Sequence, residues 1–537
     1  MKSSSLSLIA GTVALAAVTG FAVLTAPGDT SAAEPKAATR LPVERSSLLC
    51  PAPGRSDLAE TTYTAYTPAA DGAGGGGGGA GTAELTPSTA ATADGTAGGS
   101  GKGDGGKEED KKKDDKGGKD DKGGGKSGKD GKGDGKTDST KPVLSLKEPG
   151  KPVTAEVSGA GAPALVGTAT GRLAPGWAAQ QTTVVEAGAR GLLGVSCTSP
   201  GADFWFPAVS TAKSREDYVH LTNPDDTAAV ADIELYGPDG SLKSDVGEGI
   251  TVPARSGVRV LISTLTSEAV EDVTAHVTTR TGRVGAAVRT ADDTTGSDWL
   301  AASVSPNGTL VLPGIPADAT SVRLVAFAPG DDDADLKIQL LGPGGPISPV
   351  GNESLHVKSR MTAGVDLKDV TRGEPGSLLL SPTKGGEGTP VVAALRVVRG
   401  KGDGREAGYI PATGPVGAQA TAADNRAKGS TLSLTAPGAT GTVKVIASAG
   451  SEGGEQVVKT YTVKGGTTLA VTPPVPSGLK GGYALTVRTE SGGPVHAART
   501  LSLPQDGVQM FTVQTLSDDR GTVAVPDAVQ DLSVLDD

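Results

Sequence analysis

The chain repeats itself at a spacing of about 105 residues, and this period limits the fold more than any other feature. The clearest landmark is a strand-like segment with two adjacent alanines and a basic residue, which follows a glycine-containing turn. It occurs at 284–289, 391–396 and 495–499. A chain with such a period builds a series of similar small units, each packed against its neighbours, rather than one large core.

Other segments recur at the same spacing, and they alternate apolar with polar residues. Such alternation predicts half-buried strands, and the proline and glycine turns between them mark the strand ends. Each unit holds roughly seven short strands, the number typical of an immunoglobulin-like sandwich. The recurring segments are 218–224, 322–329 and 432–437, then 232–240, 337–345 and 443–450, then 250–252, 355–357 and 461–463.

The sequence therefore predicts an all-β fold, a tandem array of about four Ig-like β-sandwich repeats. The term describes architecture only, since the cysteine pair around a tryptophan that marks true immunoglobulin domains is absent from each repeat. A β-propeller-like fold with two blades per repeat is the alternative, because blades of about 40–50 residues also fit the period. Aromatic residues make up only 3% of the chain, so we expect small cores of alanine, valine and leucine.

The N-terminus carries an export segment. Lys2 precedes an apolar run at 6–24 that is long enough to span a bilayer, and small residues at 30–33 resemble a cleavage site. The run is either an uncleaved membrane anchor or a long signal peptide. Both interpretations place the rest of the chain outside the cytoplasm.

A Gly/Lys/Asp-rich insert follows at 71–141. It contains a glycine run at 74–79 and nearly balanced lysines and acids, with few apolar residues to offset the entropy of ordering. We predict a disordered insert, which is either a linker between domains or a loop inside the first unit.

The two cysteines, Cys50 and Cys197, lie on either side of this insert. In an exported chain we expect them to form a disulfide. Residues 192–197 resemble the alanine-pair strand, 204–206 its aromatic follower, and 47–51 the strand that ends at a proline. On this hypothesis one sandwich is interrupted by the insert.

The predicted boundaries follow from these landmarks and from the composition. They are 1–33 for the signal or anchor helix, 46–70 for the first strands of repeat 1, 71–141 for the insert, 142–212 for the remainder of repeat 1, 213–305 for repeat 2, 306–415 for repeat 3 and 416–537 for repeat 4.

No catalytic constellation emerges from the sequence. The four histidines lie in predicted strands without metal-ligand spacing, and no nucleophile elbow occurs in the repeats. We predict no catalytic residue, no cofactor and no enzyme activity. The histidines are His220, His276, His356 and His496.

Two other classes of residue could form binding sites. Asp331, Asp333 and Asp335 could offer alternate carboxylates to Ca²⁺, but this turn supplies few of the required oxygens, so we interpret it as a solvated acidic turn. Tryptophans can stack on glycans. Trp205 and Trp299 occupy what we take as a recurring aromatic position, which favours core packing, while Trp177 stays a candidate.

The layout resembles a family of uncharacterised secreted or membrane-anchored proteins from Streptomyces and related actinobacteria. The resemblance rests on the N-terminal helix, the Leu48-Leu49-Cys50-Pro51 segment, the insert, residues 190–197 and residues 204–206. It implies a domain of unknown function and an extracytoplasmic location, and it carries over no functional residue.

These observations favour an exported cell-envelope protein with a non-catalytic structural, scaffold or docking role. The alternative is an extracytoplasmic glycan- or solute-binding protein with a site in a groove between repeats. The expected partner is an envelope glycan or protein, with membrane contact only through an uncleaved N-terminal helix. The net charge of −11 argues against nucleic acid as a partner.

Overall fold

The computed structural model describes residues 39–54, 56–69, 80–88, 93–94, 141–186, 190–244, 246–505 and 507–525. Strands dominate these residues, which contain no α-helix, so the prediction of an all-β fold is confirmed. The predicted export segment and most of the predicted insert lie outside the described residues. Within the described part, no helix has the length and apolarity to cross a membrane. The short 3₁₀ turns are Gly171–Leu173, Ile262–Thr264 and Gly402–Gly404.

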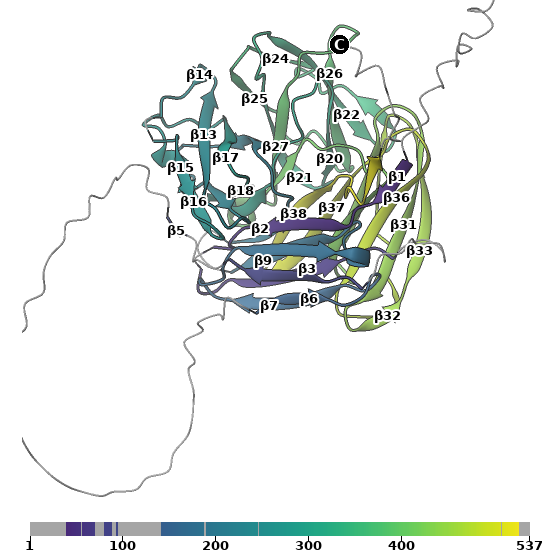
Figure 1. The fold of residues 1–537 in the computed structure, drawn as a ribbon. Coiled ribbons are helices and arrows are strands. Elements are labelled where there is room, and N and C mark those ends of the chain that lie inside the picture. Colours follow the sequence, from purple (N-terminus) through teal and green to yellow (C-terminus); the bar gives the residue numbers. More distant parts are fainter. Residues whose placement is uncertain are drawn as a thin grey trace, which may run out of the picture. The chain divides into compact units, whose positions relative to one another are not determined.

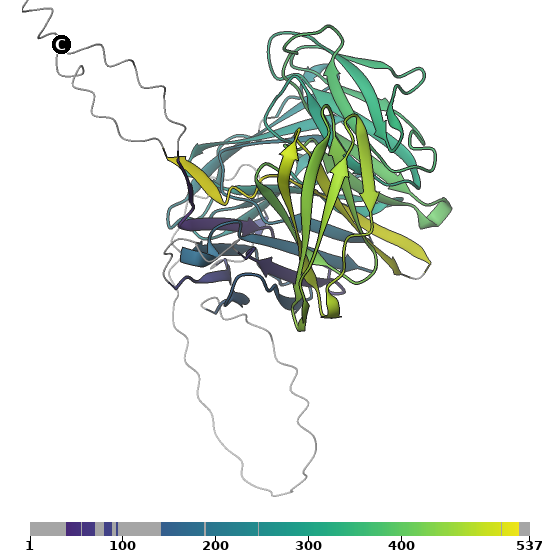
Figure 2. The same cartoon turned by 90° about the vertical axis from the view of Figure 1, so that its right-hand side faces the viewer.

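The chain divides into two compact units. The smaller is a two-stranded antiparallel ribbon of β1 (Thr39–Pro42) and β39 (Thr522–Val525), drawn in dark purple and yellow in Figure 2. Leu41 lies opposite Val523 in this ribbon, and both side chains are exposed. The larger unit, residues 43–521, contains the repeats.

The first repeat is one sandwich built from both sides of the insert, so purple and blue strands interleave in Figure 1. Its sheets have the orders β2-β8-β4-β6 and β10-β9-β3-β7. The strands are β2 (Arg45–Cys50), β3 (Glu60–Tyr66), β4 (Ala83–Pro87), β6 (Leu144–Leu146), β7 (Val153–Ser158), β8 (Leu165–Thr170), β9 (Ala178–Val185) and β10 (Gly191–Ser196).

The second repeat uses the orders β11-β17-β13-β14 and β19-β18-β12-β16-β5, with β15 also paired to β13. The short β5 (Ala93–Asp94) is added from the insert and runs parallel to β16. The other strands are β11 (Asp203–Val209), β12 (Tyr218–Thr222), β13 (Ala229–Gly237), β14 (Gly240–Ser241), β15 (Ile250–Val252), β16 (Gly257–Leu261), β17 (Val273–Thr281), β18 (Gly285–Asp292) and β19 (Gly296–Leu300).

The third repeat has the orders β20-β26-β22-β23 and β25-β21-β27-β28, with β24 also paired to β22. Its strands are β20 (Leu310–Ile315), β21 (Ala319–Phe327), β22 (Ala334–Gly342), β23 (Gly345–Ile347), β24 (Ser354–Val357), β25 (Thr362–Asp366), β26 (Gly376–Pro382), β27 (Val392–Arg399) and β28 (Glu406–Pro411).

The fourth repeat has the orders β29-β36-β31-β33 and β34-β30-β37-β38, and a small hairpin-like sheet β32-β35. Its strands are β29 (Gln419–Asn425), β30 (Ser430–Ala436), β31 (Gly441–Gly450), β32 (Gly453–Glu455), β33 (Val457–Val463), β34 (Thr467–Val471), β35 (Ser477–Lys480), β36 (Tyr483–Gly492), β37 (His496–Gln505) and β38 (Val508–Leu516).

All four repeats thus share one topology, in which two sheets enclose a core of small and medium apolar side chains. A propeller blade would be a single sheet, so the sandwich prediction holds. Burial alternates along the strands as the period-two pattern predicted; β13, for example, alternates buried residues with half-buried or exposed ones.

The predicted start of the insert was wrong. Residues 83–87 form β4, which pairs with β6 and β8 inside the first sandwich, and Leu85 is completely buried. The segment Ala-Glu-Leu-Thr-Pro alternates correctly for a strand. Glycine, alanine and threonine dominate the average composition of the surrounding stretch, so this composition does not reveal the short strand.

The predicted assignment of strands in the first repeat was also wrong. Residues 191–196 form β10, the last strand of its sheet, and residues 203–209 form β11, which pairs with β17 as the first strand of the second sandwich. The true counterpart of the alanine-pair strand is β9, which begins Ala178-Ala179 and lies beside β3 as β18 lies beside β12. The second repeat therefore begins before residue 213.

The sandwiches contact one another in a closed cycle. The last strands β10, β19, β28 and β38 touch in that order, and β38 returns to β10. The first strand of each sandwich packs on the next sandwich: β2 on β18, β11 on β27, β20 on β37, and β29 on β9. Apolar clusters shared between neighbours accompany these contacts, such as Leu192 with Leu501 and Met510.

Gly191 tests how closely the last strands pack. A β-carbon at this residue would lie 2.2 Å from the backbone oxygen of Ser297 in β19, so Gly191→Ala must push β10 and β19 apart. We expect a loss of about 1–3 kcal/mol in the free energy of unfolding, measured by urea denaturation. Gly161→Ala is the matched control, because a β-carbon there meets nothing within 4 Å. Equal losses of unfolding free energy for the two substitutions would contradict the close contact between β10 and β19.

Cleavage of the insert tests the interrupted sandwich. After proteolysis between residues 95 and 140, the two fragments should stay covalently joined under non-reducing denaturing conditions. After reduction they should separate on a denaturing gel and still co-elute in native size exclusion, because β3 and β4 lie inside sheets completed by β6 to β9. Elution of free fragments from the native column would show that the insert is a linker.

Candidate functional site

A charged pocket of about 90 Å³ lies where the second sandwich meets the third. The second sandwich contributes the segment after β11 and the ends of the loops around β17 and β18. The third contributes side chains of β21 and β27. The charged residues that line the pocket are Arg215, Glu271, Asp272, Asp292, Arg323 and Arg396.

The bulged end of β11 shapes one wall. The pairing of β11 with β17 skips a residue between Pro207 and Val209. Ala208, the skipped residue, has φ 74°, a left-handed conformation that is strained for alanine. The chain then turns back, and the backbone N–H of Ser210 donates to Asp217 Oδ2 at 2.8 Å. This turn brings Arg215 to the pocket.

Arg215 and Asp217 form a buried bidentate ion pair. Arg215 Nε donates to Asp217 Oδ1 at 3.1 Å and Nη2 donates to Oδ2 at 2.7 Å. The guanidinium also lies over the ring of Tyr409 from the third sandwich, 5.8 Å from its centroid. Burial lowers the pKa of Arg215, but Tyr409 and Asp217 outweigh it and the net shift is upward. The group therefore remains a cation.

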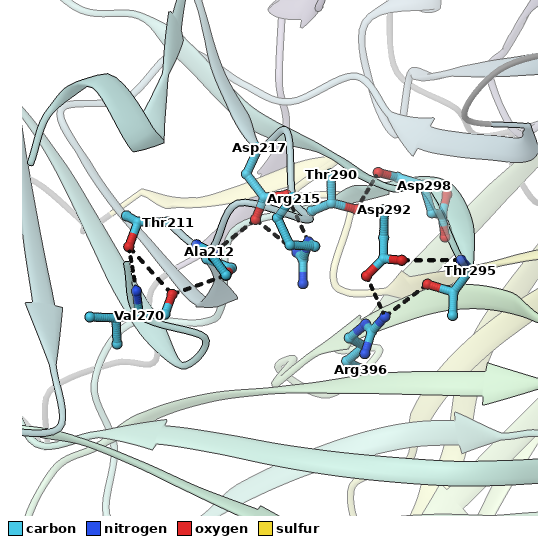
Figure 3. A network of polar contacts seen from close by, with 11 residues as sticks. Thr211, Ala212, Arg215, Asp217, Val270, Thr290, Asp292, Thr295, Asp298 and Arg396 are labelled. Atoms are coloured by element: carbon cyan, nitrogen blue, oxygen red, sulfur yellow. Dashed lines mark hydrogen bonds and ion pairs between the residues drawn. The ribbon is translucent and has the colours of Figure 1, made fainter. Parts of the chain in front are cut away.

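The Arg215–Asp217 pair lies within the second sandwich, whereas two other ion pairs join the second sandwich to the third. Arg396 Nη2 donates to Asp292 Oδ2 at 3.1 Å and to Thr295 Oγ1 at 2.8 Å, and Figure 3 shows these contacts beside the Arg215–Asp217 pair. Burial raises the pKa of Asp292, but hydrogen bonds from Thr294 and the charge of Arg396 lower it further, so this carboxylate stays ionised.

The other crossing pair joins Arg323 to Asp272. Arg323 Nε donates to Asp272 Oδ1 at 2.7 Å, and Nη2 donates to Oδ2. Each arginine of the pocket thus holds a carboxylate, and the lining is close to neutral as a whole. Such an arrangement can hold the sandwiches in register and can offer hydrogen bonds to a ligand.

A second polar site lies where the four last strands meet. Asp298 Oδ1 accepts hydrogen bonds from the N–H of Gly194 at 3.2 Å, the hydroxyl of Thr512 at 3.0 Å and the N–H of Trp299 at 2.8 Å. The backbone N–H of Tyr409 also acts on this carboxyl group. Gly194, Trp299, Tyr409 and Thr512 come from the first, second, third and fourth sandwiches, so one carboxyl group contacts all of them.

Asp298 is completely buried, and Oδ2 has no well-formed hydrogen bond to any described residue. Burial raises the pKa of Asp298 well above its ordinary value of 3.8, although the donors around Oδ1 oppose the shift. Asp298 therefore forms a polar link between the sandwiches at the centre of the cycle.

A buried arginine marks the contact between the fourth and first sandwiches. Arg499 Nη2 donates to Gln180 Oε1 of β9 at 3.3 Å and to Gln514 Oε1. Asp424 of β29 accepts a hydrogen bond from Thr182 Oγ1 at 2.7 Å. Burial lowers the pKa of Arg499 to about 10, so it stays charged at neutral pH. The closure of the cycle is therefore polar as well as apolar.

The structure joins Cys50 and Cys197 in a disulfide, with 4.4 Å between their Cα atoms. Cys50 ends β2 and Cys197 follows β10, so the bond links the two sheets of the first sandwich. It also connects the segments before and after the insert.

The acidic turn of the third sandwich has partners that satisfy its carboxylates. Asp331 Oδ1 accepts from Arg360 Nε at 3.0 Å, and Asp333 Oδ1 accepts from the N–H of Ser359 at 2.8 Å. His356 lies between Asp333 and Asp335, with its Nδ1 2.8 Å from Asp335 Oδ1. Nowhere in the described ranges do three His, Cys, Asp or Glu side chains form a group that could hold a metal.

All four histidines lie in strands, as predicted, and they lie apart. Burial lowers the pKa of His220 to about 3. Burial also lowers the pKa of His496 to about 4, against hydrogen bonds to the backbone that raise it. His276 stacks on Trp205 with ring centroids 3.5 Å apart and contacts Asp203 and Glu234.

The three tryptophans are buried, so none offers an exposed surface for stacking on a glycan. Trp205 and Trp299 are buried, but they pack between sandwiches and not in the core of the second, Trp299 beside Leu193 of the first sandwich, and they do not share one repeating position. Trp299 lies in a last strand, whereas Trp205 lies in the first strand β11, against Phe327 of the third sandwich. Trp177 packs in the core of the first sandwich.

Sequence reasoning missed the pocket and the Asp298 junction. One usable signal was present: Arg289, Arg396 and Arg499 end the same segment in three repeats, and a charged residue repeated next to buried alanines indicates a contact outside the sandwich core. Asp298, Gly408 and Thr512 lie at corresponding places of three last strands, but they differ in chemistry, so repetition could not identify them.

Asp298→Asn tests the electrostatics of the junction. A carboxyl group with a raised pKa binds its proton more tightly in the folded than in the unfolded chain. Its contribution to stability is complete below pH 3.8 and is lost as pH rises toward the raised value. Asparagine keeps the accepting oxygen and cannot ionise. The free energy of unfolding of the wild type, relative to Asp298→Asn, should therefore fall across this range in urea denaturation at several pH values.

The exposed Asp239→Asn is the control for this measurement. Parallel pH curves for Asp298→Asn and the wild type would show that Asp298 has an ordinary pKa in the folded protein.

Comparison with known proteins identifies the family of the chain. Residues 153–474, more than half of the chain and including strands of all four sandwiches, match a family of unknown function, DUF5719. No curated protein matches the chain. A domain of unknown function is what the resemblance noted from the sequence implied, and the chain belongs to the DUF5719 family.

Proposed function

We propose that this chain is an exported, non-catalytic scaffold or docking protein of the cell envelope. The observation that carries the proposal is the closed cycle of four sandwiches, in which the buried charged groups serve contacts between sandwiches. A closed array fixes the spacing of the surfaces that it presents, which is the property a docking module needs.

The disulfide supports an extracytoplasmic location. Structural disulfides persist in oxidising compartments and are rare in the cytosol. The bond closes a loop with a sequence separation of 147, for which a chain-entropy model gives about 5 kcal/mol of stabilisation at most. The apolar run at 6–24 would supply the export signal or the membrane anchor.

The charged pocket favours a second candidate function, an extracytoplasmic glycan- or solute-binding protein. The pocket lies between repeats, it is polar, and its hydrogen-bonding groups are held in place by their own partners. Binding proteins commonly place such sites at contacts between domains.

Co-sedimentation with isolated cell-wall sacculi tests the docking role. The oxidised protein without residues 1–33 should bind saturably, and the same protein reduced and unfolded should not. We expect no effect of added Ca²⁺, because Arg360 and His356 occupy the carboxylates of the acidic turn. A folded protein of similar negative charge serves as the control.

Absence of binding to sacculi, followed by absence of any crosslinked envelope partner in intact cells, would overturn the docking role. Turnover of an envelope glycan or ester by the purified protein would overturn the non-catalytic role.

A further inference from the structure

We propose that the pocket between the second and third sandwiches binds a neutral, hydroxyl-rich ligand, such as the terminal sugar of a glycan. The proposal assigns a ligand class to the second candidate function and does not depend on the scaffold role. It rests on how the charges of the pocket are paired, on which donors remain unused, and on the size of the cavity.

The pairing of charges disfavours an ionic ligand. Arg215, Arg323 and Arg396 each already hold a carboxylate, and Glu271 adds a further negative charge at the exposed rim. Counting Asp217 behind the lining, four carboxylates accompany the three guanidinium groups, so a simple anion meets a small net negative charge. A simple cation competes with three guanidinium groups that are always charged. Either ion gains most by breaking an existing pair, and breaking a buried pair is strongly destabilising.

A hydroxyl group can use the pairs without breaking them. It accepts a hydrogen bond from a guanidinium N–H and donates one to a carboxylate oxygen, so neighbouring hydroxyls match a wall where donors and acceptors alternate. The donors are available: Arg215 and Arg323 use Nε and Nη2 for their carboxylates, and no hydrogen bond joins their Nη1 atoms to the rest of the described chain. Arg396 Nε is buried and has no hydrogen-bond partner among the described residues.

The polar groups are fixed before any ligand arrives. Ser210 N–H holds Asp217, and Thr294 holds Asp292 through its N–H at 2.8 Å and its hydroxyl at 2.6 Å. Little conformational entropy is then lost on binding, which partly offsets the small contact area.

The size of the cavity limits the ligand to one end of a molecule. About 90 Å³ corresponds to roughly three water molecules, enough for the hydroxyl-bearing edge of one sugar and too little for several rings. Small side chains line part of the pocket, Ala208, Ala212 and Ser214, and of these Ser214 is exposed to solvent. The described residues that line the pocket include no aromatic side chain, so we expect millimolar affinity and recognition of a chain end rather than of an extended glycan.

Ligand-observed saturation-transfer NMR on the full folded chain tests the proposal. The neutral probes are glucose and N-acetylglucosamine, and the ionic probes are inorganic phosphate and glycine. Ser214→Phe should fill the mouth from an exposed loop without removing an ion pair. Ser348→Phe, in an exposed loop of the third sandwich, is the matched control. Circular dichroism and thermal unfolding establish that both variants fold.

We expect saturable transfer to at least one neutral sugar, weakened about tenfold or more by Ser214→Phe and unchanged by Ser348→Phe. Competition by phosphate or glycine alone, absence of transfer to every sugar, or equal transfer in the wild type and Ser214→Phe would overturn the proposal. Sedimentation with sacculi by the same Ser214→Phe variant separates the two ideas, since a docking surface elsewhere would be unaffected.

Discussion

The contact of the four last strands at Asp298 is the constraint on which the arrangement of the sandwiches depends. Each sandwich could enclose its own core, but four similar units form a closed cycle only if their last strands approach closely. Gly191 and Gly194 of β10 have no side chains, and this absence allows the neighbouring strands to come close to β10. Asp298 then accepts hydrogen bonds from strands of other sandwiches. A buried carboxyl group in this position is costly unless its donors are in place, so the junction favours one register of the cycle over others.

The charged residues between the sandwiches also favour one arrangement of the sandwiches, but they do so through ion pairs and hydrogen bonds of arginines. Ion pairs from Asp272 and Asp292 reach arginines of the third sandwich, and Arg499 joins the fourth sandwich to the first. Buried pairs of this kind add less to stability than their contacts suggest, because desolvation offsets most of the attraction, but they penalise wrong pairings strongly. The same chemistry leaves a polar pocket whose unused N–H groups can bind hydroxyls. The proposed scaffold role and the proposed ligand-binding role are therefore compatible for one set of residues.

Several features of the fold followed from the sequence because they depend on local patterns. Period-two alternation predicted the strands, and the repeat predicted similar units. The errors came from places where local pattern is short or ambiguous. β4 was hidden in a glycine- and threonine-rich stretch, and the last strand of the first sandwich was mistaken for its alanine-pair strand. Trp205 was assigned to the wrong position, because an aromatic residue in an alternating strand has the same local pattern whichever strand carries it. Pairing partners, which distinguish these strands, are not local information.

The sequence by itself determined the fold class, the number of units and the strand character of the histidine-bearing segments, since all three depend on periodicity along the chain. The tertiary structure alone decided how the fourth sandwich meets the first, which arginine holds which carboxylate, and that Asp298 lies among four strands. These contacts join residues far apart in the chain, such as Thr182 with Asp424 and Gly194 with Thr512. No propensity or spacing encodes such pairs, because their energy exists only after the separate sandwiches have formed and packed together.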